Sequence, residues 1–379
     1  MKGVTKKFGD VTAVDHLDLD VRDGEFFVIL GPSGAGKTTT LKSVGGLIEI
    51  DEGEVFISDR NMTLVEPYRR NVAMAFESYA LYPQKSVFEN LASPLKSGRT
   101  GKYSAQEQKS RIEAVTTTLG IENLLQRLPK ELSNGQRQRV ALGRVLVRPA
   151  DIYLLDEPLS HLDAKLRAAM RAELKQLGGL SNTTVLYVTH DYQEALALGD
   201  RIAVLRHGKL VQLGTPKDIW QRPVDDFVAR ALGQPEMDLI AAEVVDGRLK
   251  AANGAIDLTV PPGLSLSAHS NVQLGMRPRD LEVVRPGRGG QDWATFAGQV
   301  ILTERVGRDV AITVQVSDTK IVALVTGAQA PAEGAHVELQ MHLGDVHVFE
   351  ERREGQWSLR LGSMHGPDNI ANTKTREPS

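Results

Sequence analysis

The sequence has 379 residues, which is enough for roughly two or three domains. Its 45 basic and 48 acidic residues leave a net charge of −3, which argues against a surface that coats nucleic acid. The absence of cysteine excludes disulfide scaffolds, thiolate metal sites and thiol catalysis. A membrane-spanning helix needs about 20 mainly apolar residues, and the longest run without a charged residue, 258–276, contains Pro261 and Pro262. The opening residues lack the apolar run of a signal peptide.

The first part of the chain alternates short apolar runs with helical patterns. We expect buried strands at residues 25–30, 72–76, 152–155 and 184–188, because each is a continuous apolar run of strand length. Helical patterns follow at residues 37–47, 164–177 and 192–198. This alternation predicts a mostly parallel α/β sheet.

The stretch from residue 87 to residue 148 changes to a helical pattern, with Pro129 as a break. We therefore expect a helical subdomain inserted in the α/β domain. Two capping boxes are predicted, one in which Ser104 pairs with Glu107 and one in which Asp191 pairs with Glu194, because each pair has the required spacing of three residues.

From about residue 235 the chain carries short alternating runs that are separated by turn residues. We expect strands at residues 299–302, 310–316, 320–325, 337–341 and 346–349. This pattern predicts an all-β domain over residues 235–362, as a small barrel or sandwich. Residues 363–379 are polar and without apolar periodicity, so we expect a disordered tail.

Residues 31–38, GPSGAGKT, match the phosphate-binding pattern GxxxxGK(S/T). The pattern follows a predicted strand and opens a predicted helix, which is the context it requires. Its glycines let backbone N–H groups converge on phosphate oxygens, and the helix N-terminus adds partial positive charge. We expect Lys37 to reach the β- and γ-phosphates and Thr38 to ligate Mg²⁺.

Polar residues end the next two predicted strands. Asp156 and Glu157 follow residues 152–155, and His190 follows residues 184–188. Ligands of such sheets bind at the carboxyl ends of the strands, so we expect Asp156 to hold Mg²⁺ through water and Glu157 to polarise the attacking water. An acidic pair after a strand is also a common helix cap, and a lone histidine there is more often a structural partner.

Residues 132–136, LSNGQ, resemble the LSGGQ signature of ABC ATPases. The order of motifs is also that of the family: phosphate loop, Q-loop region, signature, acidic strand, D-loop and switch histidine. Within the family, residues 78–83 and 159–167 look like the ATPases of carbohydrate importers such as the maltose and glycerol-phosphate systems. Residues 274–278 and 347–349 look like parts of the regulatory domain of those subunits.

The resemblance implies the fold of each part of the chain. Residues 1–234 would form an α/β P-loop NTPase, the ABC cassette, with its helical subdomain at about 87–148. Residues 235–362 would form an all-β domain of the oligosaccharide-binding (OB-like) type.

The resemblance also implies site residues. Lys37, Glu157 and His190 would be catalytic, and Thr38, Glu77 and Asp156 would hold Mg²⁺. Phe8 would stack on adenine, and the signature would act in trans on ATP bound to a second subunit. The full set of nucleotide contacts would be Phe8, Gly31, Pro32, Ser33, Gly34, Ala35, Gly36, Lys37, Thr38, Thr39, Ser133, Gly135, Gln136, Asp163 and His190.

The function that the resemblance implies is ATP hydrolysis that powers import of a sugar or a sugar-like polyol. The partners would be a second ATPase subunit, two membrane permeases and, indirectly, an external solute-binding protein, with no nucleic acid. The chain would lie at the cytoplasmic face of the inner membrane, and residues 77–86 would receive a permease helix. Alternatives are an importer of polyamine, iron or another ion, a weakened subunit of a heterodimeric pair, a mainly regulatory ATP-binding subunit, and a non-transport ABC protein.

Two positions depart from the family pattern. Asn134 stands where the signature usually has glycine, and Glu77 stands where the Q-loop has glutamine. A carboxylate can still offer an oxygen to Mg²⁺, but it cannot donate the amide hydrogen bond and adds negative charge beside the triphosphate.

We predict that Glu77→Gln preserves or raises ATPase activity, because it removes this charge and restores the donor. Steady-state turnover with ATP and Mg²⁺ measures the effect. A large loss of turnover would show instead that Glu77 is adapted to its site.

Overall fold

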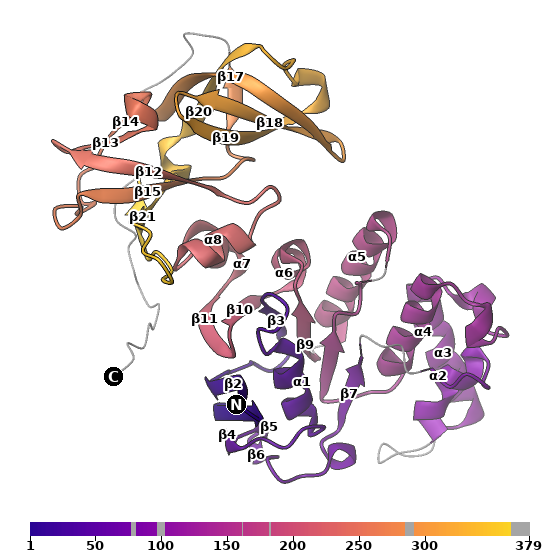
Figure 1. Cartoon of the computed structure of the whole chain (residues 1–379). Coiled ribbons are helices and arrows are strands. Elements are labelled where there is room, and N and C mark those ends of the chain that lie inside the picture. Colours follow the sequence, from indigo (N-terminus) through magenta and orange to yellow (C-terminus); the bar gives the residue numbers. More distant parts are fainter. Residues whose placement is uncertain (77–80, 97–102, 161, 182, 285–291, 365–379) are drawn as a thin grey trace. The chain divides into compact units, whose positions relative to one another are not determined.

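The computed structural model describes residues 1–76, 81–96, 103–160, 162–181, 183–284 and 292–364 (Figure 1). The chain divides into two compact units, Met1–Pro216 and Lys217–Ser379, and each is described by itself. The boundary that we expected after residue 234 falls inside the second unit. Asp226 joins that unit because its backbone N–H donates to the Ser358 carbonyl at 3.0 Å and its Oδ1 accepts from the Ser358 N–H at 2.9 Å. In the described part of the chain, no helix is both long enough and apolar enough to cross a membrane.

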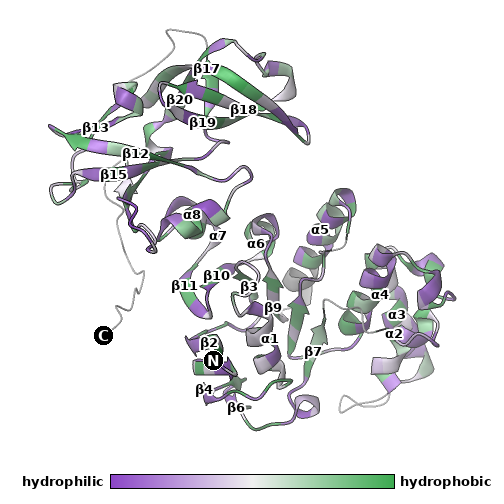
Figure 2. Ribbon diagram, in the orientation of Figure 1, coloured by the Kyte–Doolittle hydropathy of each residue, from purple (hydrophilic) through white to green (hydrophobic). Residues whose placement is uncertain are grey.

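A six-stranded sheet forms the centre of the first unit, in the order β11-β10-β3-β9-β8-β7. Every neighbouring pair from β10 to β7 is parallel, and only β11 pairs antiparallel. The strands are β3 (Phe26–Leu30), β7 (Val72–Ala75), β8 (Ile152–Asp156), β9 (Thr184–Thr189), β10 (Arg201–Arg206) and β11 (Lys209–Gly214). The predicted parallel sheet is therefore confirmed. Figure 2 shows the central strands in the green of hydrophobic residues, as expected for strands covered on both faces.

A second, antiparallel sheet of order β2-β1-β4 belongs to the same unit, and we did not predict it. It consists of β1 (Lys2–Phe8), β2 (Val11–Leu17) and β4 (Glu52–Glu54), and a small hairpin of β5 (Phe56–Ile57) and β6 (Arg60–Asn61) follows. Val4 and Val14 on this sheet share one hydrophobic core with Leu41 of helix α1 (Lys37–Gly45) and Leu186 of β9. This packing fixes the helix that follows the phosphate loop.

The predicted helical segment contains α2 (Val87–Lys96), α3 (Ala105–Leu119) and α4 (Asn134–Leu146), with short 3₁₀ turns at Glu122–Leu124 and Pro129–Glu131. The capping box at Ser104 is confirmed: Ser104 Oγ accepts from the Glu107 N–H at 3.2 Å, and Glu107 Oε2 accepts from the Ser104 N–H at 2.8 Å. Helix α4 contacts both α2 and β7, so the segment is joined to the sheet (Figure 1).

Helices α5 (Ala164–Ser181) and α6 (Tyr192–Leu198) complete the first unit. The capping box predicted at the start of α6 is wrong in one half. Asp191 does cap the helix, with Oδ1 accepting from the Gln193 N–H at 2.7 Å. The Glu194 side chain instead lies buried and accepts from the hydroxyls of Tyr187 and Thr189, at 2.8 Å each. Two buried hydroxyl donors outcompete one backbone donor because they need an acceptor away from water.

The second unit is mainly β, as predicted, with two sheets of order β14-β13-β12-β15-β21-β22 and β16-β20-β17-β18-β19. Side chains from both sheets share one core, for example Leu274, Phe296, Ile312 and Val348. The expected strands at residues 299–302, 310–316, 320–325 and 337–341 lie within β17, β18, β19 and β20, and the one expected at residues 346–349 begins one residue before β21. The elements are α7 (Pro216–Gln221), α8 (Asp226–Ala231), β12 (Asp238–Val245), β13 (Arg248–Ala251), β14 (Ile256–Thr259), β15 (Asn271–Met276), β16 (Glu282–Val284), β17 (Trp293–Val306), β18 (Asp309–Val316), β19 (Thr319–Thr326), β20 (His336–His342), β21 (His347–Glu350) and β22 (Arg360–Ser363). The disordered tail expected over residues 363–379 is wrong at its start, because Ser363 belongs to β22 and Met364 is buried. Residues 365–379 lie outside the described residues.

Arg70 fastens the C-terminal end of α1. Its Nη1 donates to the carbonyls of Ser43 and Val44 at 3.0 Å each, and its Nε donates to the Val65 carbonyl at 2.8 Å. Helix C-termini leave carbonyls without intrahelical partners, so this buried guanidinium satisfies groups that would otherwise lose hydrogen bonds. Burial lowers the pKa of Arg70, and the nearby Glu66 opposes that shift.

We predict that Arg70→Met destabilises the first unit by about 3 kcal/mol, because it leaves several buried carbonyls without donors. The exposed neighbour Arg69 provides the control, and Arg69→Met should change stability by about 0.5 kcal/mol or less. Denaturant unfolding followed by far-UV circular dichroism measures both, since the long helices lie in this unit. Equal effects of the two substitutions would contradict the assigned role of Arg70.

Candidate nucleotide site

Three loops leave the central sheet at the same edge. Leu30 at the end of β3 is paired with Thr189 at the end of β9, and Val188 is paired with Asp156 at the end of β8. Because these pairings are parallel, the residues that follow the three strands meet at the carboxyl edge. The phosphate loop, the acidic pair and His190 are thereby brought together.

The phosphate loop runs from Gly31 to the start of α1 and passes close to neighbouring backbone. A Cβ on Gly31 would lie 2.5 Å from the Leu205 carbonyl oxygen, and a Cβ on Gly36 would lie 2.2 Å from that of Ala13. Gly36 also has a φ of 94° at the N-cap of α1, a backbone geometry that favours glycine. The buried Lys37 crosses the loop, with Nζ donating to the Pro32 carbonyl at 2.9 Å. The loop thus combines a helix N-terminus with a held cation, which suits a phosphate group.

Thr38 and Asp156 are in direct contact: Thr38 Oγ1 donates to Asp156 Oδ1 at 3.0 Å. Asp156 is buried. A hydroxyl and a carboxylate are the hard oxygen ligands that Mg²⁺ accepts, and Mg²⁺ in such sites takes its remaining ligands from phosphates and water. Among the described residues no three His, Asp or Glu side chains form a metal cluster, so this pair fits a cation that arrives with a phosphate. Glu77, the third predicted ligand, lies outside the described residues.

Glu157 lies between two basic side chains. Its Oε2 is 2.8 Å from His190 Nδ1, and its Oε1 is 3.9 Å from Lys37 Nζ. The residue has a φ of 45°, which is uncommon for a residue with a side chain. Its backbone is held on both sides, since its N–H donates to the Val188 carbonyl at 3.0 Å and its carbonyl accepts from Ser160 Oγ at 3.0 Å. The carboxylate is therefore fixed beside the phosphate-loop lysine, as a group that orients water should be.

Buried polar residues support this edge from behind. Thr189 Oγ1 accepts from the Asp191 N–H at 2.9 Å and donates to Glu194, so the turn that carries His190 is fixed. Burial raises the pKa of Glu194 and also raises the pKa of Tyr187, whose hydroxyl donates to that carboxyl group. The sequence patterns did not reveal this network, because Glu194 matched a capping position equally well.

Gln138 is a further residue that sequence reasoning missed. It lies on α4, is buried, and its Nε2 approaches the Glu157 carbonyl at 3.5 Å. The contact joins the helix of the signature to the acidic loop. A glutamine next to the signature carried no distinct pattern of its own, so only the fold brings the two together.

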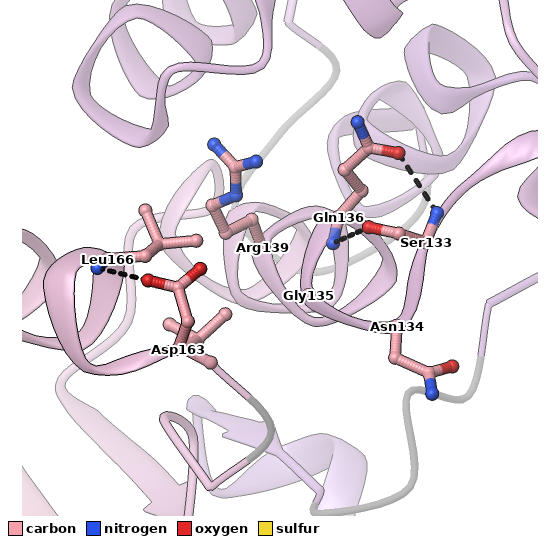
Figure 3. Close-up of a pocket in the computed structure, with 8 residues that line it drawn as sticks. Ser133, Asn134, Gly135, Gln136, Arg139, Asp163 and Leu166 are labelled. Atoms are coloured by element: carbon pink, nitrogen blue, oxygen red, sulfur yellow. Dashed lines mark hydrogen bonds between the residues drawn. The ribbon is translucent and has the colours of Figure 1, made fainter.

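The signature residues surround a separate cavity of about 400 Å³ at the start of α4 (Figure 3). Ser133 caps the helix by accepting from the Gln136 N–H at 3.3 Å, and Gln136 Oε1 accepts from the Ser133 N–H at 2.9 Å. Across the cavity, Asp163 Oδ1 accepts from the Leu166 N–H at 2.9 Å. The lining residues are Ser133, Asn134, Gly135, Gln136, Arg139, Leu162, Asp163 and Leu166. None of them belongs to the phosphate loop, so the structure does not bring the two halves of the predicted site together within one chain.

The remaining predicted contacts lie at the surface or in α1. Phe8 ends β1, is half exposed, and has Lys6 Nζ 5.4 Å from its ring centroid. It is not part of the core, which leaves its face accessible to a flat ligand. Thr39 lies in the first turn of α1, where its carbonyl accepts from Ser43 Oγ at 2.9 Å.

Comparison with protein families matches residues 14–160 to the ABC transporter family and residues 274–349 to the TOBE domain. The chain is 42% identical to the xylose/arabinose import ATP-binding protein of Haloferax volcanii over 96% of this chain and 94% of that protein. It is 40% identical to the trehalose/maltose import ATP-binding protein of Thermococcus litoralis, over 92% of this chain and 96% of that protein. The chain is an ABC-type ATPase of the import ATP-binding protein family.

This ABC ATPase is also similar to solved structures of a single cassette. A bacterial ABC transporter cassette, solved as a dimer, superposes with a TM-score of 0.53 at 33% identity and covers 57% of this chain and 97% of its own. The same cassette in a post-hydrolysis state with ADP and phosphate gives a TM-score of 0.53 at 32% identity. The family matches and these solved cassettes confirm the predicted ABC cassette fold, and the TOBE match together with the β-rich second unit confirms the OB-like C-terminal domain. ATP is the substrate of the cassette.

We predict that Gly36→Ala lowers the affinity of this ATPase for ATP at least tenfold, because its Cβ would displace the backbone of the phosphate loop. Gly254→Ala is the control: its φ is also positive, at 83°, nothing lies within 4 Å of the added Cβ, and Gly254 is not part of the phosphate loop. It should show only the backbone cost of about 1–2 kcal/mol in stability.

Binding of a fluorescent ATP analogue, with circular dichroism as a folding control, measures both variants. The geometry assigned to the phosphate loop would be wrong if the two variants lost the same affinity.

Proposed function

We propose that this ABC ATPase hydrolyses ATP at the edge of the central sheet and thereby powers import of a sugar or a sugar-like polyol. The observation that carries the chemical part is the placement of Glu157 between Lys37 and His190, beside the phosphate loop. The substrate class is supported by similarity to sugar and glycerol-phosphate import proteins over nine-tenths of the chain.

Each residue at this edge has a role in the proposed reaction. The loop from Gly31 to Thr39 binds the phosphates through backbone N–H groups, and Lys37 neutralises the β- and γ-phosphates. Thr38 and Asp156 hold Mg²⁺, which stabilises negative charge on the phosphate oxygens. Glu157 orients the attacking water and takes up its proton, and His190 contacts the γ-phosphate.

A second subunit completes the site in this proposal. Ser133, Gly135 and Gln136 of one copy face the γ-phosphate bound by the other copy, with Asp163 at the seam. Support comes from the open cavity at the start of α4, which has a capped helix N-terminus but no phosphate loop of its own. A helix N-terminus favours bound phosphate. Closure of two copies therefore sandwiches two ATP molecules.

Closure of the dimer is transmitted to two membrane permeases, on which the dimer docks at the cytoplasmic face of the membrane. The described part of the expected docking segment supports this role. Tyr82 is half exposed, and its ring is flanked by Lys85 Nζ at 4.5 Å and by Arg144 Cζ at 4.6 Å. Asn90 holds the backbone beneath, donating to the carbonyls of Tyr82 and Lys85 at 3.1 Å and 2.9 Å. A rigid aromatic platform of this kind suits a protein helix as partner.

Glu157→Gln should leave ATP binding intact and lower turnover by at least a hundredfold, because the amide preserves the shape but cannot accept the proton. Phosphate release at saturating ATP measures turnover, and equilibrium binding of ATP provides the control. Retained turnover would move the role of base to another residue.

The proposed substrate class predicts the result of an uptake experiment. A strain that lacks this ATPase should lose uptake of one labelled pentose, disaccharide or glycerol phosphate, and the wild-type gene should restore it while the Glu157→Gln gene should not. Uptake of labelled spermidine and ferric iron in the same strains is the control. Loss of polyamine or iron uptake with sugar uptake unchanged would favour the alternative importer class.

A further inference from the structure

Asn134 is the first residue of α4 and lines the signature cavity next to Ser133 and Gly135. The LSGGQ signature that it resembles has glycine at this position, so Asn134 adds a side chain that the usual signature lacks. Figure 3 shows it directed away from the capping pair of Ser133 and Gln136. It therefore takes no part in capping the helix, and its amide is available for another contact.

The orientation of this amide is set by Arg137, three residues further along α4. Arg137 Nη2 donates to Asn134 Oδ1, a pair at the i, i+3 spacing at which helical side chains meet. A guanidinium can only donate hydrogen bonds, so the atom that faces Arg137 must be the amide oxygen. The Nδ2 donors are consequently turned away from Arg137, and no described protein group accepts from them.

In the proposed dimer, the signature cavity receives the γ-phosphate of the ATP bound by the partner copy. Phosphate oxygens only accept hydrogen bonds. An amide oxygen facing the phosphate would repel it, whereas an amide N–H₂ would add a donor to those of the helix N-terminus. With its oxygen occupied by Arg137, Asn134 can offer only the favourable group.

We propose that Arg137 is a positioning residue which holds Asn134 so that its Nδ2 donates to the γ-phosphate of the ATP bound by the partner copy. The inference rests on the proposed function of the signature in trans. Asn134 is then an additional phosphate contact, and this contact depends on the Asn134–Arg137 pair.

The test uses the full chain with Glu157→Gln, in which ATP-driven dimers accumulate, and measures the ATP concentration for half-maximal dimerisation by analytical ultracentrifugation. Asn134→Gly removes the donor and should raise this concentration about threefold. Asn134→Asp keeps the shape but places an acceptor against the phosphate, and should raise it at least tenfold. Thermal unfolding of the Asp variant should be unchanged or higher, since a carboxylate suits a helix N-terminus.

A double-mutant cycle tests the role of Arg137. In the Glu157→Gln chain with Asn134 present, Arg137→Ala should raise the ATP concentration for half-maximal dimerisation about threefold. In the same chain with Asn134→Gly, Arg137→Ala should cause no further rise. Lys130→Ala, at a nearby exposed lysine, should change neither. A purely structural role for Arg137 would give the same loss in both backgrounds and would overturn the inference, as would equal ATP requirements for the Gly and Asp variants.

Failure of the proposed function would give a different set of results. In that case the original chain hydrolyses no ATP and its Glu157→Gln variant forms no ATP-dependent dimer, so the inference falls together with the function. If hydrolysis and dimerisation occur, the results for the variants at Asn134 and Arg137 test the proposed phosphate contact independently of the proposed function.

Discussion

The parallel register of β3, β9 and β8 is the constraint on which the nucleotide site depends. It places Leu30 opposite Thr189 and Val188 opposite Asp156, so that three loops from distant parts of the sequence leave the sheet at one level. A slip of one residue in such pairing turns every side chain to the other face. Asp156 would then point away from Thr38, and Glu157 could not lie between Lys37 and His190.

The rest of the first unit maintains this register. The antiparallel sheet of β1, β2 and β4 packs on α1 through the same core as the central strands, and Arg70 fastens the end of that helix. At the other side, Glu194 joins Tyr187 and Thr189 of β9 under the turn that carries His190. Loss of one partner from a buried hydrogen bond of this kind costs much free energy of folding. These bonds therefore hold the residues around the nucleotide site in fixed positions.

Much of the site could be predicted from the sequence because the signals are local. The phosphate loop needs a strand, a glycine turn and a helix in succession, and residues 25–47 supply them in order. The end of α1 at Gly45, two residues before the predicted end, depends on the αL residue Gly46 and on Arg70, which is remote in sequence. The same limit applies to Glu194 and Gln138, whose partners are fixed by packing.

The β1–β2 hairpin was missed for another reason. Its strands mix charged, polar and apolar residues without a regular alternation, and residues 2–8 contain three lysines, so neither an apolar run nor a period of two marks them. Strands β12 and β15 of the second unit were likewise not predicted, although they pair along most of their length. In both cases the stability comes from cross-strand pairing between segments, which one segment alone does not display.

The central claim is that one catalytic site is built from two copies of the chain, and mixing two defective copies tests it most directly. Lys37→Ala removes the phosphate contact of a copy but leaves its signature, and Ser133→Arg blocks the signature but leaves the phosphate loop. Since the chain contains no cysteine, a single introduced cysteine allows each variant to be prepared as a donor-labelled batch and an acceptor-labelled batch, in the Glu157→Gln background. The two batches of one variant, mixed with each other, are the controls. Energy transfer between the dyes should appear with ATP only when the two variants are mixed, because only then is one composite site intact. A mixture that stays as silent as each variant alone, although the Ser133→Arg copy binds ATP, would contradict the account.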